Sequence, residues 1–148
     1  VVLWHGRTRW PDKCWNFNVY NDLKAARILF TSNLPLILFD TGTYLYCPMQ
    51  ESEETIAPYG ALGKYLHDFR YKSDWYQSPT KGFYDLGDIA AVVEPSLVYS
   101  KVEYAPEVTW DMQYVHNRKH GKMRRIYQID RDGTFDLLHR KLKDFVGE

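Results

Sequence analysis

The first forty residues read as a strand, a loop, a helix and a second strand, which is the pattern of a β-α-β unit. Residues 1–4 and 35–39 are short, continuous apolar runs, typical of strands buried on both faces. Between them, Asp22 is expected to open a helix, because an N-cap carboxylate accepts hydrogen bonds from free backbone N–H groups. Asn33 is expected just past the end of that helix, since Asn tolerates the left-handed conformation. The pattern predicts an α/β fold with parallel strands.

The rest of the chain is predicted to continue as helices and strands of one α/β unit. Helical patterns cover residues 51–71 with an interruption near Pro58, 86–93 and 132–145, and strand patterns cover 98–104, 107–115 and 122–129. The apolar faces of the two longer helices are predicted to consist of Leu62, Tyr65, Leu66 and Phe69, and of Phe135, Leu138, Leu142 and Phe145.

Charge and composition exclude several classes of function. Lys and Arg together number 19, as do Asp and Glu, so no basic surface for nucleic acid or an anionic membrane is expected. No apolar run approaches the roughly 18 residues of a membrane span. Two cysteines far apart fit no metal-ligand spacing, which favours a reducing cytoplasm. The sequence begins inside a predicted strand without a leader, so we expect a truncated chain.

Two short segments carry side chains suited to a binding site. Asn16, Phe17 and Asn18 lie between a strand and a helix, where ligands of open α/β sheets bind, and amides suit sugar hydroxyls. Asn also caps its own loop backbone, and Phe17 is expected to lock the loop. Tyr84 and Asp85 precede the helix over 86–93. Asp85, like Asp88, is either an N-cap or a ligand for a hard cation, and Tyr84 offers a ring and a hydroxyl.

Together these segments resemble the inosine-uridine preferring nucleoside hydrolase family. Asn16-Phe17-Asn18 and Asp22-Leu-Lys-Ala-Ala26 are similar to that family's Glu-Phe-Asn and Asp-Pro-Glu-Ala-Ala signature. The Tyr84-Asp85 pair is similar to its His-Asp-Pro segment. Weaker similarities follow in the same order along nearly the whole chain, at Leu3-Trp4-His5-Gly6, Asn33-Leu-Pro-Leu36, Glu94-Pro95-Ser96-Leu97 and Ile129-Asp130-Arg131.

The resemblance implies that residues 1–148 are the C-terminal part of a nucleoside hydrolase-like domain, a Rossmann-like mixed sheet with flanking helices. Such proteins cleave the N-glycosidic bond of ribonucleosides and hold Ca²⁺ at the ribose. By position, Asn18 would bind the ribose 5′-hydroxyl, Asn16 and Phe17 would line the ribose pocket, and Asp85 would ligate Ca²⁺ and a ribose hydroxyl. Tyr84 stands at the position that protonates the leaving base. The expected partners are a ribonucleoside and, in the full-length protein, further copies of the same chain.

Departures from the family pattern weaken the expectation of activity. Asn16 replaces a Glu, Tyr84 replaces a His, and the run Asp-Xaa-Asp-Xaa-Gly-Xaa-Asp-Asp that supplies most calcium ligands does not occur. Because a hard-cation site needs several oxygen ligands, we expect this chain to be inert without an Asp-rich N-terminal half. Two alternatives are a non-catalytic sugar- or nucleoside-binding module, and an assembly role in which exposed aromatics such as Trp75 and Tyr76 form a subunit contact.

Overall fold

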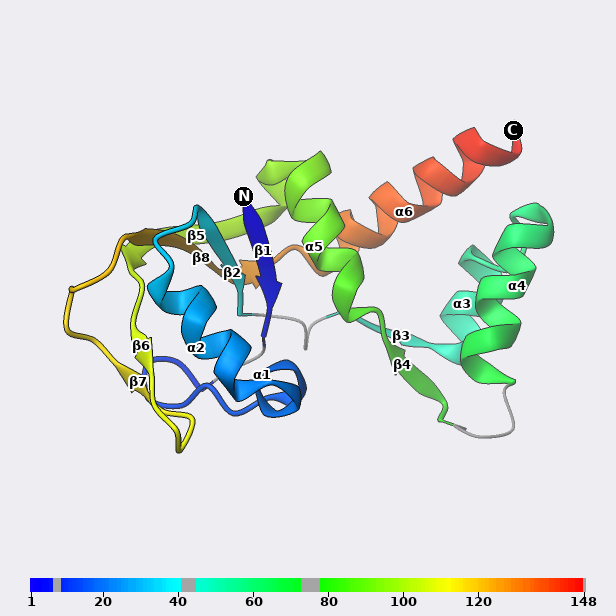
Figure 1. The fold of residues 1–148 in the computed structure, drawn as a ribbon. Helices are drawn as coiled ribbons and strands as arrows, with labels where there is room; N and C mark the ends of the chain where they lie inside the picture. The colour runs from blue at the N-terminus through cyan, green and yellow to red at the C-terminus, as the bar shows by residue number, and fades with distance from the viewer. Residues whose placement is uncertain (7–8, 41–44, 73–77, 148) are drawn as a thin grey trace.

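A mixed four-stranded sheet forms the centre of the molecule (Figure 1). The computed structural model describes residues 1–6, 9–40, 45–72 and 78–147. Strands β1 (Val2–His5), β2 (Leu36–Phe39) and β8 (Lys122–Ile129) run parallel, and β5 (Val98–Tyr104) pairs with β8 in the antiparallel direction. The order β1-β2-β8-β5 leaves β1 at one edge among the described strands. The predicted α/β class and the mixed sheet are confirmed.

The predicted β-α-β unit joins β1 to β2. Helix α2 (Leu23–Thr31) begins after Asp22, whose Oδ1 accepts a hydrogen bond from the Ala25 N–H at 2.8 Å. A second helix, α1 (Phe17–Asn21), precedes it where the sequence predicted a loop. That part of the prediction was wrong, because the Asn16 side chain caps the α1 backbone.

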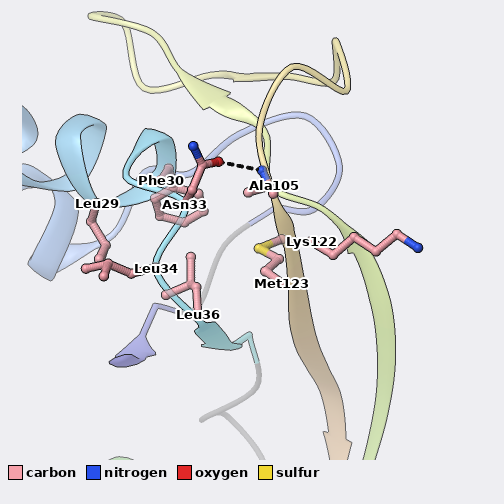
Figure 2. A pocket seen from close by; sticks show the side chains of 9 residues that line it. Leu29, Phe30, Asn33, Leu34, Leu36, Ala105, Lys122 and Met123 are labelled. Carbon is pink, nitrogen blue, oxygen red and sulfur yellow. Dashed lines mark hydrogen bonds between the residues drawn. The ribbon is translucent and has the colours of Figure 1, made fainter. Parts of the chain in front are cut away.

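Asn33 follows Ser32, the C-cap residue of α2, and has the predicted left-handed conformation with φ 58°. Its Oδ1 accepts from the Gly121 N–H at 2.8 Å, the dashed line in Figure 2, and so ties the α2 terminus to the chain entering β8. The hollow beside it measures about 10 Å³, close to the smallest space that holds one water. The contact between the end of α2 and the start of β8 is therefore a packing contact and not a ligand site.

Hydrophobic residues cover both faces of the sheet, because successive side chains of a strand point to opposite sides. Leu36 and Leu38 of β2 pack in one core cluster with Phe30 of α2. Phe39, also on β2, belongs to the second cluster with Phe135 of helix α6 (Arg131–Val146). Helices therefore flank both faces of the sheet, as in a Rossmann-like protein.

Two smaller units lie at opposite ends of the molecule (Figure 1). At one end, the ribbon of β3 (Tyr46–Pro48) and β4 (Thr80–Gly82) carries α3 (Met49–Thr55) and α4 (Gly60–Tyr71). At the other end, β6 (Glu107–Val108) and β7 (Tyr114–Val115) form a hairpin. Helix α5 (Tyr84–Val93) and a 3₁₀ turn (Pro95–Leu97) lead into β5. None of the described helices has the length and apolar character that crossing a membrane requires.

Two sequence predictions about packing were wrong. The buried side of α4 is formed by Gly63, His67 and Tyr71, while most of the predicted apolar face is exposed. The polar residues are buried because they have partners: the Tyr71 hydroxyl donates to the Cys47 carbonyl at 2.6 Å. Phe145 of α6 is likewise exposed, although the rest of its predicted face packs against the core.

The predicted single strand over residues 107–115 is instead the β6–β7 hairpin. Met112 has a φ of 57°, a left-handed conformation that interrupts an extended strand. Asp111 stabilises this turn, since its Oδ2 accepts from Gln113 Nε2 at 2.7 Å. Local side-chain hydrogen bonds therefore override the strand pattern here.

Candidate functional site

Polar side chains from three elements meet at the carboxyl end of β1, where His5 is the last residue of the strand. Asn18 of α1 donates from Nδ2 to the His5 carbonyl oxygen at 2.7 Å. On α5, Asp88 Oδ2 lies 2.8 Å from His5 Nδ1, and Asp85 Oδ1 lies 3.9 Å from the same nitrogen. The structure therefore brings the predicted residues Asn18 and Asp85 to one place, next to His5.

Packing beneath the site fixes the position of the His5 ring. The ring stacks on the fully buried Phe39, with centroids 5.5 Å apart and an interplanar angle of 25°. Helix α5 approaches Phe39 closely at Gly87, where an added Cβ would lie 2.4 Å from Phe39 Cζ and 2.9 Å from Leu45 Cδ1. Glycine at this position therefore lets α5 sit near enough for Asp88 to reach His5.

Opposite effects act on the pKa of His5. Burial lowers the pKa, but the hydrogen bond with Asp88 and the negative charges of Asp88 and Asp85 outweigh it, so the pKa is raised from its ordinary value. Asp88 is 8% exposed, and its Oδ1 is buried without a hydrogen-bond partner among the described residues. The site thus contains a carboxylate that is bonded to His5 through one oxygen only.

The three side chains His5, Asp85 and Asp88 lie close enough together that they could hold a metal ion. One possible ligand atom of each lies within 4.8 Å of the others. This donor set does not fit the Ca²⁺ that the resemblance implies, because Ca²⁺ takes six to eight oxygen ligands and one donor here is an imidazole. No chemical step is therefore assigned to Ca²⁺ at these residues.

The other predicted site residues have local roles. Asn16 uses both ends of its amide on the backbone: Oδ1 accepts from the Val19 N–H at 3.1 Å and Nδ2 donates to the Cys14 carbonyl at 2.9 Å. The Phe17 side chain is exposed, which gives no support to the prediction that it locks the loop. The Tyr84 hydroxyl donates to the Tyr46 hydroxyl at 3.3 Å, and its ring lies 6.4 Å from the His5 ring.

One of the two interpretations made Asp85 or Asp88 the N-cap of α5. Neither residue is the N-cap. The N-cap residue is Phe83, with no side-chain hydrogen bond to the helix, and Asp85 lies in the first turn. Asp88 lies three residues further along and on the same helical face. That spacing was the one sequence signal that could have paired the two carboxylates, whereas nothing local in the sequence pointed to His5.

The residues of the predicted subunit contact, Trp75 and Tyr76, lie outside the described residues.

Helices on both faces of a mostly parallel sheet define an open α/β protein, a class in which ligands bind at the carboxyl ends of strands. No protein-family model and no curated protein matches the sequence. Solved structures do match. A plant nucleoside hydrolase is similar at 21% identity and a TM-score of 0.68, covering 84% of this chain and 46% of its own.

Two bacterial proteins match in the same way. A purine-preferring ribonucleoside hydrolase from Gardnerella vaginalis is 18% identical with a TM-score of 0.69, covering 87% of this chain and 46% of its own. An inosine-uridine preferring nucleoside hydrolase from Bacillus anthracis is 16% identical with a TM-score of 0.64, and the match covers 95% of this chain and 50% of that protein. The chain therefore has the fold of part of a nucleoside hydrolase and spans about half the length of these proteins.

Proposed function

We propose that this chain is part of a ribonucleoside hydrolase domain, in which it forms one wall of the ribose pocket. The observation that carries the proposal is the meeting of Asn18 and Asp85 at His5, at the carboxyl end of β1. These two residues are the ones to which the resemblance gives ribose-binding roles, and they come from distant parts of a chain with the hydrolase fold.

The exposed polar atoms suit recognition of a sugar. Asn18 is exposed and uses Nδ2 on the His5 carbonyl, and its Oδ1 has no hydrogen-bond partner within the described ranges. In the proposed pocket, that oxygen accepts a hydrogen bond from a ribose hydroxyl. The Asp85 side chain is 92% exposed, so its carboxylate is free to accept from a second hydroxyl. The proposed reaction is hydrolysis of the N-glycosidic bond to ribose and a free base.

Apolar surface around the site supports the view that a second half of the domain packs here. Strand β1 is an edge strand among the described residues, although its sequence is apolar. Ile89, Val92 and Val93 of α5 are exposed, as are Phe17 and Tyr20 of α1. In the proposed protein, an Asp-rich N-terminal half covers this surface and supplies the metal ligands and the base that activate water.

The proposal also covers the cellular compartment, the substrate class and the assembly partner of the protein. Cys14 and Cys47 are both free and buried, which agrees with a reducing cytoplasm. The substrate class is a ribonucleoside, since the matched solved proteins include both purine-preferring and inosine-uridine preferring hydrolases. We propose further copies of the chain as the assembly partner of the complete protein.

The test compares this chain with a longer polypeptide that carries the Asp-rich half, using release of ribose from inosine and uridine. We expect turnover by the longer polypeptide and none by residues 1–148 alone. In the longer polypeptide, Asp85→Ala should lower kcat by about 100-fold or more. The matched control, Asp144→Ala, changes an exposed carboxylate at the end of α6 and should leave kcat unchanged. Full turnover by Asp85→Ala would show that the site is misplaced.

A non-catalytic nucleoside-binding module is the second candidate, favoured by the absence of the Asp-rich run from this sequence. Calorimetry of residues 1–148 with ribose or inosine, without metal, separates the two. Binding that is lost in Asn18→Ala supports the module. No heat at millimolar ligand argues against it and leaves the hydrolase proposal to the turnover assay.

A further inference from the structure

We propose that His5, Asp85 and Asp88 form a binding site for a divalent transition-metal ion such as Zn²⁺ or Co²⁺. The ion would be held by this chain's own residues, at the carboxyl end of β1 and the first turns of α5. The donors of this site differ from the oxygen set that Ca²⁺ requires, and this disagreement with the ion implied by the resemblance is the basis of the proposal.

The distances between the donor atoms lie near those around a single small ion, one slightly shorter and one slightly longer. Ligands bound at about 2.1 Å around one ion stand roughly 3 to 3.4 Å apart, from bond lengths and either octahedral or tetrahedral angles. His5 Nδ1 lies 2.8 Å from Asp88 Oδ2 and 3.9 Å from Asp85 Oδ1. The Asp85 side chain is exposed, so rotation about its side-chain bonds can bring its carboxylate to the same ion as His5 and Asp88.

The orphaned oxygen of Asp88 points independently to a ligand. Buried polar atoms in native proteins are nearly always bonded, and an unsatisfied one costs about 1 to 3 kcal/mol. Asp88 Oδ1 is buried and has no hydrogen-bond partner in the part of the chain that the structure describes. A cation bound between His5 and Asp88 satisfies this oxygen through bidentate coordination, which a hydrogen bond from His5 to Oδ2 alone does not.

The donor types set the metal class. Neutral imidazole is a common ligand of Zn²⁺, Cu²⁺, Fe²⁺ and Ni²⁺, and carboxylates complete such sites, whereas Ca²⁺ prefers oxygen ligands throughout. The His5 ring is held by its stacking on Phe39, and the His5 backbone is held by the Asn18 side chain. The nitrogen donor is therefore fixed in place before an ion arrives, which favours binding.

The test is a titration of purified residues 1–148 with Co²⁺, Zn²⁺ and Ca²⁺ separately, followed by calorimetry and, for Co²⁺, by its visible absorption. We expect one Co²⁺ or Zn²⁺ per chain, bound at least about 10-fold more tightly than Ca²⁺. His5→Asn and Asp88→Asn should each weaken Co²⁺ binding by at least about 10-fold and change the visible spectrum. His120→Asn is the matched control, because His120 also lies beside a carboxylate, that of Glu107 at 3.3 Å.

Asp85→Asn keeps the test decisive if either buried variant fails to fold, since the Asp85 side chain is exposed. Its expected result is the same weakening of Co²⁺ binding with an unchanged circular dichroism spectrum. The proposal is overturned if the folded chain binds no Co²⁺ or Zn²⁺, if Ca²⁺ binds as tightly, or if His120→Asn weakens binding as much as His5→Asn. The titration contains no nucleoside, so its outcome is independent of whether the hydrolase proposal holds.

Discussion

Replacing Gly87 with alanine tests how the fold builds the site. Gly87 lies on α5 where the helix meets the core, and an added Cβ would lie 2.4 Å from Phe39 Cζ and 2.9 Å from Leu45 Cδ1. Both neighbours are fully buried, so neither ring nor methyl group has space to move aside. Helix α5 must shift outward in Gly87→Ala, and Asp88 moves away from His5 with it.

Two opposing effects determine the change in the free energy of unfolding. Alanine is favoured over glycine inside a helix by about 1 kcal/mol. Forcing an extra methyl group into a packed core costs about 1 to 3 kcal/mol. Because the contact at Gly87 is far inside van der Waals distance, we take the upper part of that range, and the net expectation is a destabilisation of about 1 to 2 kcal/mol.

Urea denaturation followed by circular dichroism measures this change, and the Co²⁺ titration measures the displacement of Asp88. Val92→Ala is the matched control, because Val92 lies on the exposed side of the same helix and should change stability by less than about 0.5 kcal/mol. If Gly87→Ala proves more stable than the original chain by about 1 kcal/mol, Gly87 behaves as an ordinary helix glycine. The proposed dependence of the site on this contact is then refuted.

Two further predictions concern buried charge and pH. Arg125 forms ion pairs with Asp40 at 3.2 Å and with Glu103 at 2.8 Å. Arg125→Met should therefore lower the free energy of unfolding, measured by urea denaturation, by about 3 kcal/mol. The control Glu103→Gln changes the more exposed of the two carboxylates and should cost less than about 1 kcal/mol. Burial lowers the pKa of His139, so its neutral form is favoured in the folded state. Stability should be fullest above about pH 6.5 and fall as the pH drops towards the folded-state pKa, and His139→Gln should remove that part of the pH dependence in thermal unfolding.

The sequence predicted the central sheet well because its strands carry their own pattern. β5 (Val98–Tyr104) and β8 (Lys122–Ile129) have the predicted bounds, and the β-α-β unit was recognised from the helix caps Asp22 and Asn33. The buried face of α4 could not be predicted, because Tyr71 is buried through a hydrogen bond to the Cys47 carbonyl. A polar group of this kind is buried only where the tertiary structure supplies a partner.

Part of the candidate site could be predicted from the sequence, and a comparison of Asn16 with Asn18 shows why the rest could not. Both are amides of one short segment, and the sequence gives them the same interpretation. Helix α1 begins at Phe17, so Asn16 is its N-cap and the Asn16 side chain accepts a hydrogen bond from the Val19 N–H. Asn18 lies inside the helix, and its side chain donates to the His5 carbonyl oxygen. The start of one helical turn therefore decides which amide is left for a ligand.

The pairing of His5 with Asp88 was beyond sequence reasoning for a related physical cause. The two residues lie far apart in the chain and meet only because α5 packs tightly on Phe39 at Gly87. Asp85 and Asp88 share a helical face by their spacing, but which strand end that face meets is set by the packing of α5 against the sheet. The donor set follows from this packing, and with it the class of metal that the chain is proposed to hold.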